Sequence, residues 1–78
     1  MTAAELVELF SSRLTVADAQ WRSLRSHGAR QTAEGRGEIL ALGTECKRLQ
    51  ELLDAAKALL AAEQDRRRLE AAALELLA

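Results

Sequence analysis

The chain has few side chains that carry out chemistry, so their types and spacing can be tested directly. Cys46 and His27 are its only cysteine and histidine, and they form the one possible thiol–imidazole pair. Such a pair requires hydrogen-bond contact between its two members. In the helical hairpin that the sequence predicts, His27 stands about 10 Å, or two helical turns, from Cys46 along the axis. One Cys and one His also do not make a metal-ligand set. We therefore expect a protein that is not an enzyme and has no catalytic and no metal-binding residues.

A cluster of glycines near the middle of the chain is the next candidate site. Gly28, Gly35 and Gly37 fall within ten residues, in the stretch GARQTAEGRG. A phosphate-binding loop requires a preceding strand and a Gly-Lys-Ser/Thr ending, and a dinucleotide fingerprint requires a third glycine at a set spacing. Neither pattern is present, so we expect no cofactor and no small-molecule substrate. Permissive backbone instead favours a bend between two helices, which we place at residues 32–36.

Basic residues are concentrated around this bend. Residues 21–37 contain four arginines and one acidic residue, Glu34, whereas the whole chain has a net charge of −1. A basic bend with Trp21 as a stacking platform could contact nucleic acid. The run Arg66–Arg68, however, lies among acidic residues, and neither polar helix face is consistently basic. Nucleic-acid binding is therefore the least favoured alternative, and binding to a membrane surface is not expected.

The composition predicts an all-α fold. The apolar residues are nearly all Leu and Ala, Pro is absent and β-branched residues are few, which suits helices and disfavours strands. The length fits a single helical domain, residues 1–78. The lone cysteine fits a reducing compartment. The N-terminal stretch lacks the pattern of a secretory signal, and no apolar run approaches the ~20 residues that span a bilayer. These features predict a cytoplasmic protein.

Two apolar stripes at helical spacing define the expected elements, a helix over residues 3–31 and a helix over residues 37–64. Thr2 and Glu5 form a capping box that begins the first helix. Thr15 with Asp18 is a second possible cap, but the stripe stays in phase across it, so we expect one helix. The predicted core of the first helix is Leu6, Phe10, Leu14, Ala17, Trp21 and Leu24. The predicted core of the second helix is Ile39, Leu42, Cys46, Leu49, Leu53, Ala56 and Leu60, a heptad pattern that Leu52 and Leu59 widen on one side.

These stripes predict an antiparallel hairpin with coiled-coil-like packing. When the second helix folds back along the first, the position numbers of facing core residues have a constant sum, within one residue. Large residues then face small ones, as in Trp21 with Cys46 and Phe10 with Ala56, which suits interdigitated packing. Six layers match in this way.

Residues 65–78 extend beyond this hairpin as a helical extension or a third helix. They carry an apolar stripe of their own, rotated by roughly 100° or more from the core stripe of the second helix. The predicted partner-binding residues are Leu69, Ala72, Ala73, Leu76 and Leu77. The stripe could fold back on the hairpin, pair with a second copy or bind a different protein. The run EQDRRR supplies no turn chemistry for folding back, which favours contact with another molecule.

Three short stretches resemble a known family. Met1–Ala3, Arg13–Asp18 and Glu45–Arg48 look like pieces of the small co-chaperones of type III secretion needle subunits. The resemblance implies a short cytoplasmic helical hairpin that works with a second chaperone to hold an aggregation-prone subunit before export. It implies no individual binding residue.

The sequence as a whole predicts a non-enzymatic helical protein-interaction module, chaperone- or adaptor-like, that binds a partner protein through exposed apolar helix surface. The first alternative is a structural homo-oligomer that forms a helical bundle. The second, less favoured, is a small nucleic-acid-binding regulator.

Overall fold

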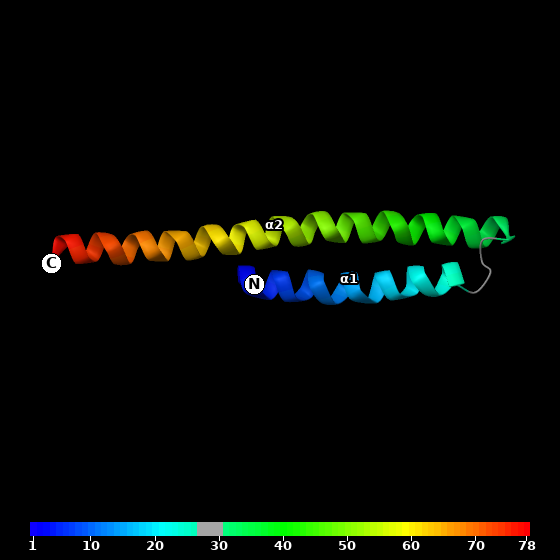
Figure 1. Cartoon of the computed structure of the whole chain (residues 1–78), viewed down its shortest axis with the longest axis horizontal. Coiled ribbons are helices and arrows are strands. Elements are labelled where there is room, and N and C mark those ends of the chain that lie inside the picture. Colours follow the sequence, from blue (N-terminus) through cyan, green and yellow to red (C-terminus); the bar gives the residue numbers. More distant parts are fainter. Residues whose placement is uncertain (27–30) are drawn as a thin grey trace.

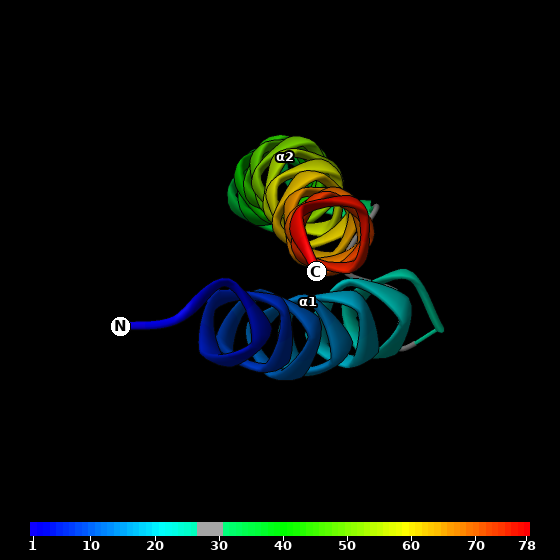
Figure 2. The same cartoon turned by 90° about the vertical axis from the view of Figure 1, so that its left-hand side faces the viewer.

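The computed structural model describes residues 1–26 and 31–78, and they form two helices. Helix α1 spans Ala3–Ser26 and helix α2 spans Ala33–Leu77. The helices lie side by side with opposite directions, and α2 continues well past the N-terminal end of α1 (Figure 1). Viewed from one end, the pair forms a single layer (Figure 2). The predicted all-α hairpin is confirmed, and the described part of the chain contains no third helix.

The first helix begins with the predicted capping box. The backbone N–H of Glu5 donates to the Thr2 hydroxyl at 3.1 Å, and the N–H of Thr2 faces the Glu5 carboxylate at 3.4 Å. The helix then continues without interruption through Thr15. The hydroxyl of Thr15 donates to the carbonyl of Ser11 at 2.9 Å instead of capping a new helix. A hydroxyl bonded back to the preceding turn leaves the helix intact.

The second helix begins earlier than the sequence pattern predicts. The bend was expected at residues 32–36, but Thr32 is the N-cap of α2, in extended backbone, and its hydroxyl accepts from the N–H of Gly35 at 2.9 Å. A threonine cap followed by an acidic residue, Glu34, is a strong helix start. It outweighs the cost of two glycines in the first turns. The predicted start at residue 37 is therefore wrong.

The end of the first helix also differs from the expected residue 31. The described part of α1 ends at Ser26, and Gln31 lies outside both helices. Residues 27–30, including His27 and Gly28, fall outside the described residues, so the expected distance between His27 and Cys46 stays a prediction.

The predicted second helix and its extension form one continuous rod. No turn interrupts the run 63–68, where Arg66 pairs with Glu70 at 3.0 Å and Arg68 with Asp65 at 2.6 Å along the same helix. At 1.5 Å per residue, α2 is about 68 Å long and α1 about 36 Å. The longest dimension of the molecule, 69 Å, is therefore the length of α2.

The core is a thin seam between the two helices. Its buried apolar residues are Ala3, Ala17, Leu49, Leu53 and Ala56. The other predicted core residues are half-buried: Leu6, Phe10, Leu14, Trp21, Leu24, Ile39, Leu42, Cys46 and Leu60. Two helices enclose only one line of contact, so no large side chain among the described residues is completely buried. Gly35 and Ala3 are buried although the sequence analysis did not place them in the core.

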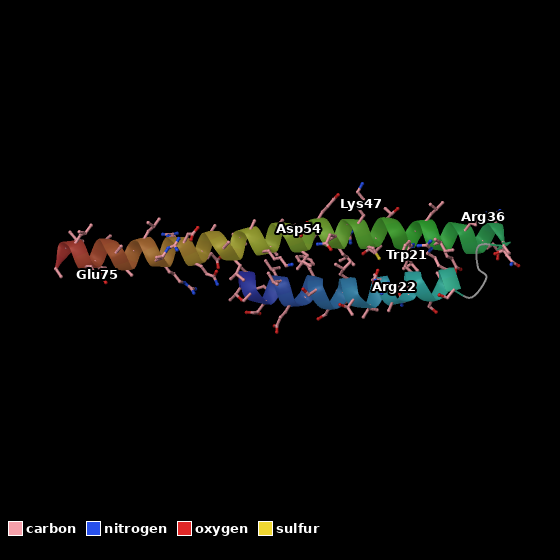
Figure 3. All side chains as sticks on the ribbon, viewed as in Figure 1. Trp21, Arg22, Arg36, Lys47, Asp54 and Glu75 are labelled. Atoms are coloured by element: carbon pink, nitrogen blue, oxygen red, sulfur yellow. The ribbon has the colours of Figure 1, made fainter. Side chains whose placement is uncertain are left out.

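The register of the pairing departs from the prediction at Trp21. The indole points toward α2 (Figure 3), where a β-carbon placed on Gly43 would stand 3.4 Å from its Nε1 atom. Gly43 lies one turn before Cys46, the residue predicted to face Trp21. The connection between the helices ends at Thr32 instead of residue 36, so facing positions on α2 move toward lower numbers.

The molecule exposes far more surface than a compact protein of its size. Its radius of gyration is 19.4 Å, whereas a compact chain of this length has about 11.5 Å. Its accessible surface is 6120 Å², against roughly 4,700 Å² for a compact monomer of this mass.

Candidate interaction surface

The segment of α2 beyond α1, hereafter the overhang (residues 64–78), has no covering element in the described structure. Glu63 is half-buried beside the start of α1, and every residue from Gln64 to Ala78 is exposed. Figure 1 shows the overhang as a bare helix leading to the C-terminal end. Among its leucines, Leu69 is 68% exposed and Leu76 is 89% exposed. Such contiguous apolar exposure marks an interaction site on most soluble proteins.

All five predicted partner-binding residues lie in this overhang. Leu69, Ala72, Ala73, Leu76 and Leu77 are exposed, and no described residue of α1 covers them. Leu74 is not among the five predicted residues, and it is also exposed. Leu74 continues the heptad phase of Leu53 and Leu60, so it is a core-stripe position that extends past the end of α1. The heptad spacing could have identified it.

A second heptad stripe runs along α2 beside the core stripe, on a face that α1 leaves exposed. Its members, spaced alternately by four and three residues, are Ala55, Leu59, Ala62, Arg66, Leu69, Ala73 and Leu76. We call this set the outer stripe, and all of it is exposed. Each of its members directly precedes a position of the core-stripe heptad, so at 100° per residue it is turned about 100° from the core stripe. Leu59 was predicted to lie at the edge of the core, so it was not grouped with the exposed residues beyond Arg66.

An open groove lies beside the start of this stripe. It has a volume of about 710 Å³ and runs between α1 and α2, with Leu9, Val16 and Leu52 among its apolar lining. Glu45 and Arg48 lie at the same groove and pair with each other at 3.3 Å. A second groove, of about 550 Å³, is lined by Leu14, Thr15, Asp18, Cys46, Lys47 and Gln50. Both are open grooves between the helices. They differ from a small-molecule site, which is an enclosed pocket.

The environment of Cys46 suits packing and disfavours nucleophilic chemistry. Burial raises the pKa of the Cys46 thiol, and the carboxylates of Asp18 and Glu45 raise this pKa further. The thiol therefore stays protonated at neutral pH, whereas a reactive cysteine needs a lowered pKa. The described residues also contain no group of three or more potential metal ligands.

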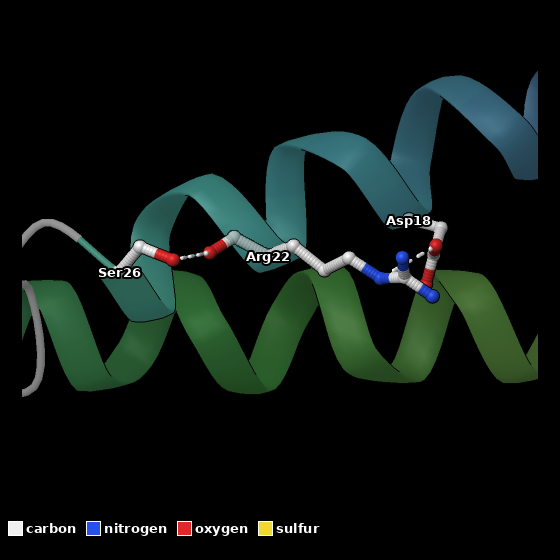
Figure 4. A network of polar contacts seen from close by, with 3 residues as sticks. All are labelled: Asp18, Arg22 and Ser26. Carbon is white, nitrogen blue, oxygen red and sulfur yellow. Dashed lines mark hydrogen bonds and ion pairs between the residues drawn. The ribbon is translucent and has the colours of Figure 1, made fainter.

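Two basic residues near the end of α1, Arg22 and Arg25, are engaged within their own helix. Arg22 pairs with Asp18 at 3.0 Å, and its carbonyl accepts from the Ser26 hydroxyl at 2.9 Å (Figure 4). The guanidinium of Arg25 lies 4.5 Å from the centroid of the Trp21 ring. One side of the indole is therefore occupied by Arg25 and its edge faces α2, which disfavours Trp21 as a stacking platform for bases.

Neither described helix is long and apolar enough to cross a bilayer. Comparisons with family models, curated proteins and solved structures give no match to this chain. Its function is therefore inferred from the exposed surface of α2.

Proposed function

We propose that this chain is a non-enzymatic helical interaction module, chaperone- or adaptor-like, that binds a partner helix through the overhang of α2. The observation that carries the proposal is the exposure of every residue from 64 to 78, a helical segment that nevertheless carries Leu69, Leu76 and Leu77. Amphipathic helices of this kind bind by placing apolar residues at i, i+3, i+4 and i+7 against a groove or another helix.

The free energy of burying the overhang leucines supports association with a partner. Burial of one leucine side chain contributes about 1.5–3 kcal/mol. The three leucines and the alanines between them can therefore offset much of the ~4–15 kcal/mol of freedom lost on association. A projecting helix of this length is also marginal by itself in water, since most helical stability comes from packing of an apolar face. A partner helix would supply that packing.

A more specific form of the proposal is a co-chaperone role. It is supported by the resemblance of Met1–Ala3, Arg13–Asp18 and Glu45–Arg48 to the co-chaperones of type III secretion needle subunits. In that form the partner is an amphipathic helix of another protein that requires protection from aggregation.

The test is to remove the apolar character of the overhang while leaving the hairpin intact. The variant replaces Leu69, Leu76 and Leu77 by Ser, and the matched control is Leu40→Ser, because Leu40 is an equally exposed leucine of α2 outside the overhang. We expect both proteins to retain helicity and thermal unfolding close to those of the parent chain. Partner capture from an extract of the native host, and any self-association, should be lost in the triple variant alone.

Two outcomes would contradict this proposal. If the triple variant loses the cooperative unfolding of the hairpin, the overhang stabilises the fold and is not an interaction surface. If the variant keeps every interaction of the parent chain, the binding surface lies elsewhere. The alternative of a structural homo-oligomer is supported by the outer stripe, an exposed and largely apolar surface that self-association would cover.

A further inference from the structure

The two flanks of the core stripe on α2 differ in polarity. The positions that directly precede the core-stripe heptad over residues 53–63 are apolar and exposed: Leu52, Ala55, Leu59 and Ala62. The positions that directly follow this heptad over residues 46–56 are polar and exposed: Lys47, Gln50, Asp54 and Lys57. Solvation accounts for the polar flank, whereas a contiguous apolar flank is typical of contact with another molecule.

The outer stripe leads into the larger of the two grooves between α1 and α2. Back from Ala55, the same alternation of three and four residues reaches the groove lining on α2, at Leu52, Arg48 and Glu45. The apolar lining that surrounds these positions is Leu9, Phe10, Val16, Ala17, Leu42 and Leu49. A helix packed along the outer stripe would therefore continue into this groove, where it would contact both helices of the hairpin.

Arg13 lines the same groove, and its own helix provides no carboxylate for it. The arginines that form ion pairs do so with acids three or four residues away: Arg22, Arg48, Arg66 and Arg68. The four positions at that distance from Arg13 are apolar and line the groove: Leu9, Phe10, Val16 and Ala17. In the described part of the chain, Arg13 is exposed and forms no ion pair.

The ionised lining of this groove is positive. It consists of two cations, Arg13 and Arg48, and one anion, Glu45, which pairs with Arg48 at 3.3 Å. The surplus positive charge is therefore located on Arg13. The smaller groove contains Asp18 and Lys47, whose charges balance. An occupant of the larger groove is complementary when its apolar stripe includes a carboxylate, because an arginine forms strong charge-assisted hydrogen bonds with that group.

We propose that the larger groove binds an amphipathic helix of another protein, and that an acidic residue in the apolar stripe of this helix pairs with Arg13. The inference rests on the proposed function, because the bound helix continues along the outer stripe to the overhang. Between Leu42 and Leu52 the groove is about 15 Å long on α2, or three helical turns. The outer stripe from Leu52 to Leu76 adds about 36 Å. A partner helix of about 34 residues would cover the whole surface.

The first experiment selects binding helices from a displayed peptide library. Its members are amphipathic helices of about 34 residues, with leucine and alanine along one stripe and one stripe position at a time varied. Helices retained by the parent chain should carry Glu or Asp at one position of the stripe. Selection on Arg13→Gln should lose this preference, and selection on Arg13→Glu should replace it by Lys or Arg. The matched control is Arg22→Gln, an arginine of α1 that does not line the groove, and it should keep the acidic preference.

The second experiment measures the affinity of one selected peptide and of its counterpart in which the acidic residue is replaced by its amide. Arg13→Gln should raise the dissociation constant of the acidic peptide at least about tenfold and leave that of the amide peptide unchanged. Val16→Ser should weaken both peptides about tenfold, because it removes an apolar contact of the groove. Val16 is 57% exposed, so circular dichroism should show an intact hairpin. Leu40→Ser changes an exposed leucine outside the groove and should have no effect.

The inference is overturned if no helix of the library binds, if the acidic preference is absent, or if Arg13→Gln retains it. A parent chain that dimerises in sedimentation, with the dimer lost in Arg13→Gln, would identify the occupant as a second copy and overturn the assignment to another protein.

Failure of the proposed function gives a different result. The variant with Leu69, Leu76 and Leu77 replaced by Ser would then bind the selected peptide as tightly as the parent chain, while Arg13→Gln would still weaken it. If the inference alone fails, the serine variant loses the peptide and Arg13→Gln binds it like the parent chain.

Discussion

Trp21 is the side chain whose surroundings differ most from a simple core position. Its indole lies against the bare backbone of Gly43 on one helix and under the guanidinium of Arg25 on its own. The ring is half-buried, so its replacement by Ala should cost less than the ~3–5 kcal/mol of a fully buried aromatic. The missing β-carbon at Gly43 lets the two helices approach at this layer.

Replacing glycines of α2 by alanine should stabilise the chain. In the middle of a helix, Gly is about 0.5–1 kcal/mol less favourable than Ala. A β-carbon at Gly37 meets open space, and one at Gly43 meets the Trp21 indole at 3.4 Å, an ordinary contact. Both Gly37→Ala and Gly43→Ala should therefore raise the free energy of unfolding by a similar amount in denaturant titrations.

Tryptophan emission separates the two variants. Gly43→Ala should shift it toward the blue, because the new methyl group covers the indole edge, while Gly37→Ala should leave it unchanged. A loss of stability in Gly43→Ala alone would mean that the helices cannot accommodate a methyl group at this layer.

The Cys46 thiol should react slowly with alkylating reagents. Burial and the carboxylates of Asp18 and Glu45 raise its pKa, and only the thiolate reacts. At mildly alkaline pH, Asp18→Asn should speed alkylation by iodoacetamide, since it removes one anionic neighbour. The control is Asp54→Asn, which changes an exposed carboxylate of α2 that is not among the groups acting on the thiol. Equal rates in the two variants would show that Asp18 does not act on the thiol.

The same raised pKa has a consequence for stability. The folded chain holds the thiol proton more tightly than the unfolded chain, whose cysteine has a pKa of about 8.5. This contribution to the free energy of unfolding is fully present below that pH. It decreases as the pH rises through the pKa of the folded state.

At the scale of elements, both helices begin with a threonine cap. The hydroxyls of Thr2 and Thr32 accept from backbone N–H groups three residues later, at 3.1 and 2.9 Å. The second cap determines where the chain reverses, because it begins α2 before the glycines that the sequence analysis assigned to the bend.

Proline at two neighbouring positions tests this cap. Ala33 is the first residue of α2 and is exposed, and its preceding residue, Thr32, has the extended backbone that proline requires. Ala33→Pro should be neutral or slightly stabilising. Gly35→Pro removes the N–H that bonds to Thr32 and should cost at least about 1 kcal/mol in unfolding experiments. Equal tolerance of the two substitutions would support a bend over residues 32–36.

At the scale of the whole molecule, the hairpin and the overhang are separable. No buried residue of the described structure lies in the overhang, since residues 64–78 are all exposed. Truncation after Glu63 should therefore reduce the helical circular dichroism only in proportion to the residues removed. The melting temperature should change by less than about 4 °C, since a change of 1 kcal/mol shifts it by at least that amount in a domain of this size. A larger decrease would show that the overhang contributes to the core.

Features that depend on local chemistry and periodicity could be predicted from the sequence alone. The absence of proline and the excess of Leu and Ala give helices, the Thr2–Glu5 box begins the first, and the unbroken run through Arg66 keeps α2 continuous. Helical spacing placed Ala17, Leu49 and Ala56 on the faces that meet. These features need no knowledge of what lies opposite, because propensity and side-chain direction are set within a few residues.

Properties that depend on two segments at once follow only from the packing of α1 against α2. The Thr32 cap and the glycines favour different positions for the reversal of the chain between the helices. The position of this reversal determines which residue of α2 faces Trp21. Burial of the core stops at one seam, because a single helix can cover only one side of α2. That geometry leaves Leu74 exposed and separates the outer stripe, from Ala55 to Leu76, as a second surface. The outer stripe stays uncovered because α1 is only about 36 Å long, against about 68 Å for α2. No periodicity within α2 encodes this difference in length.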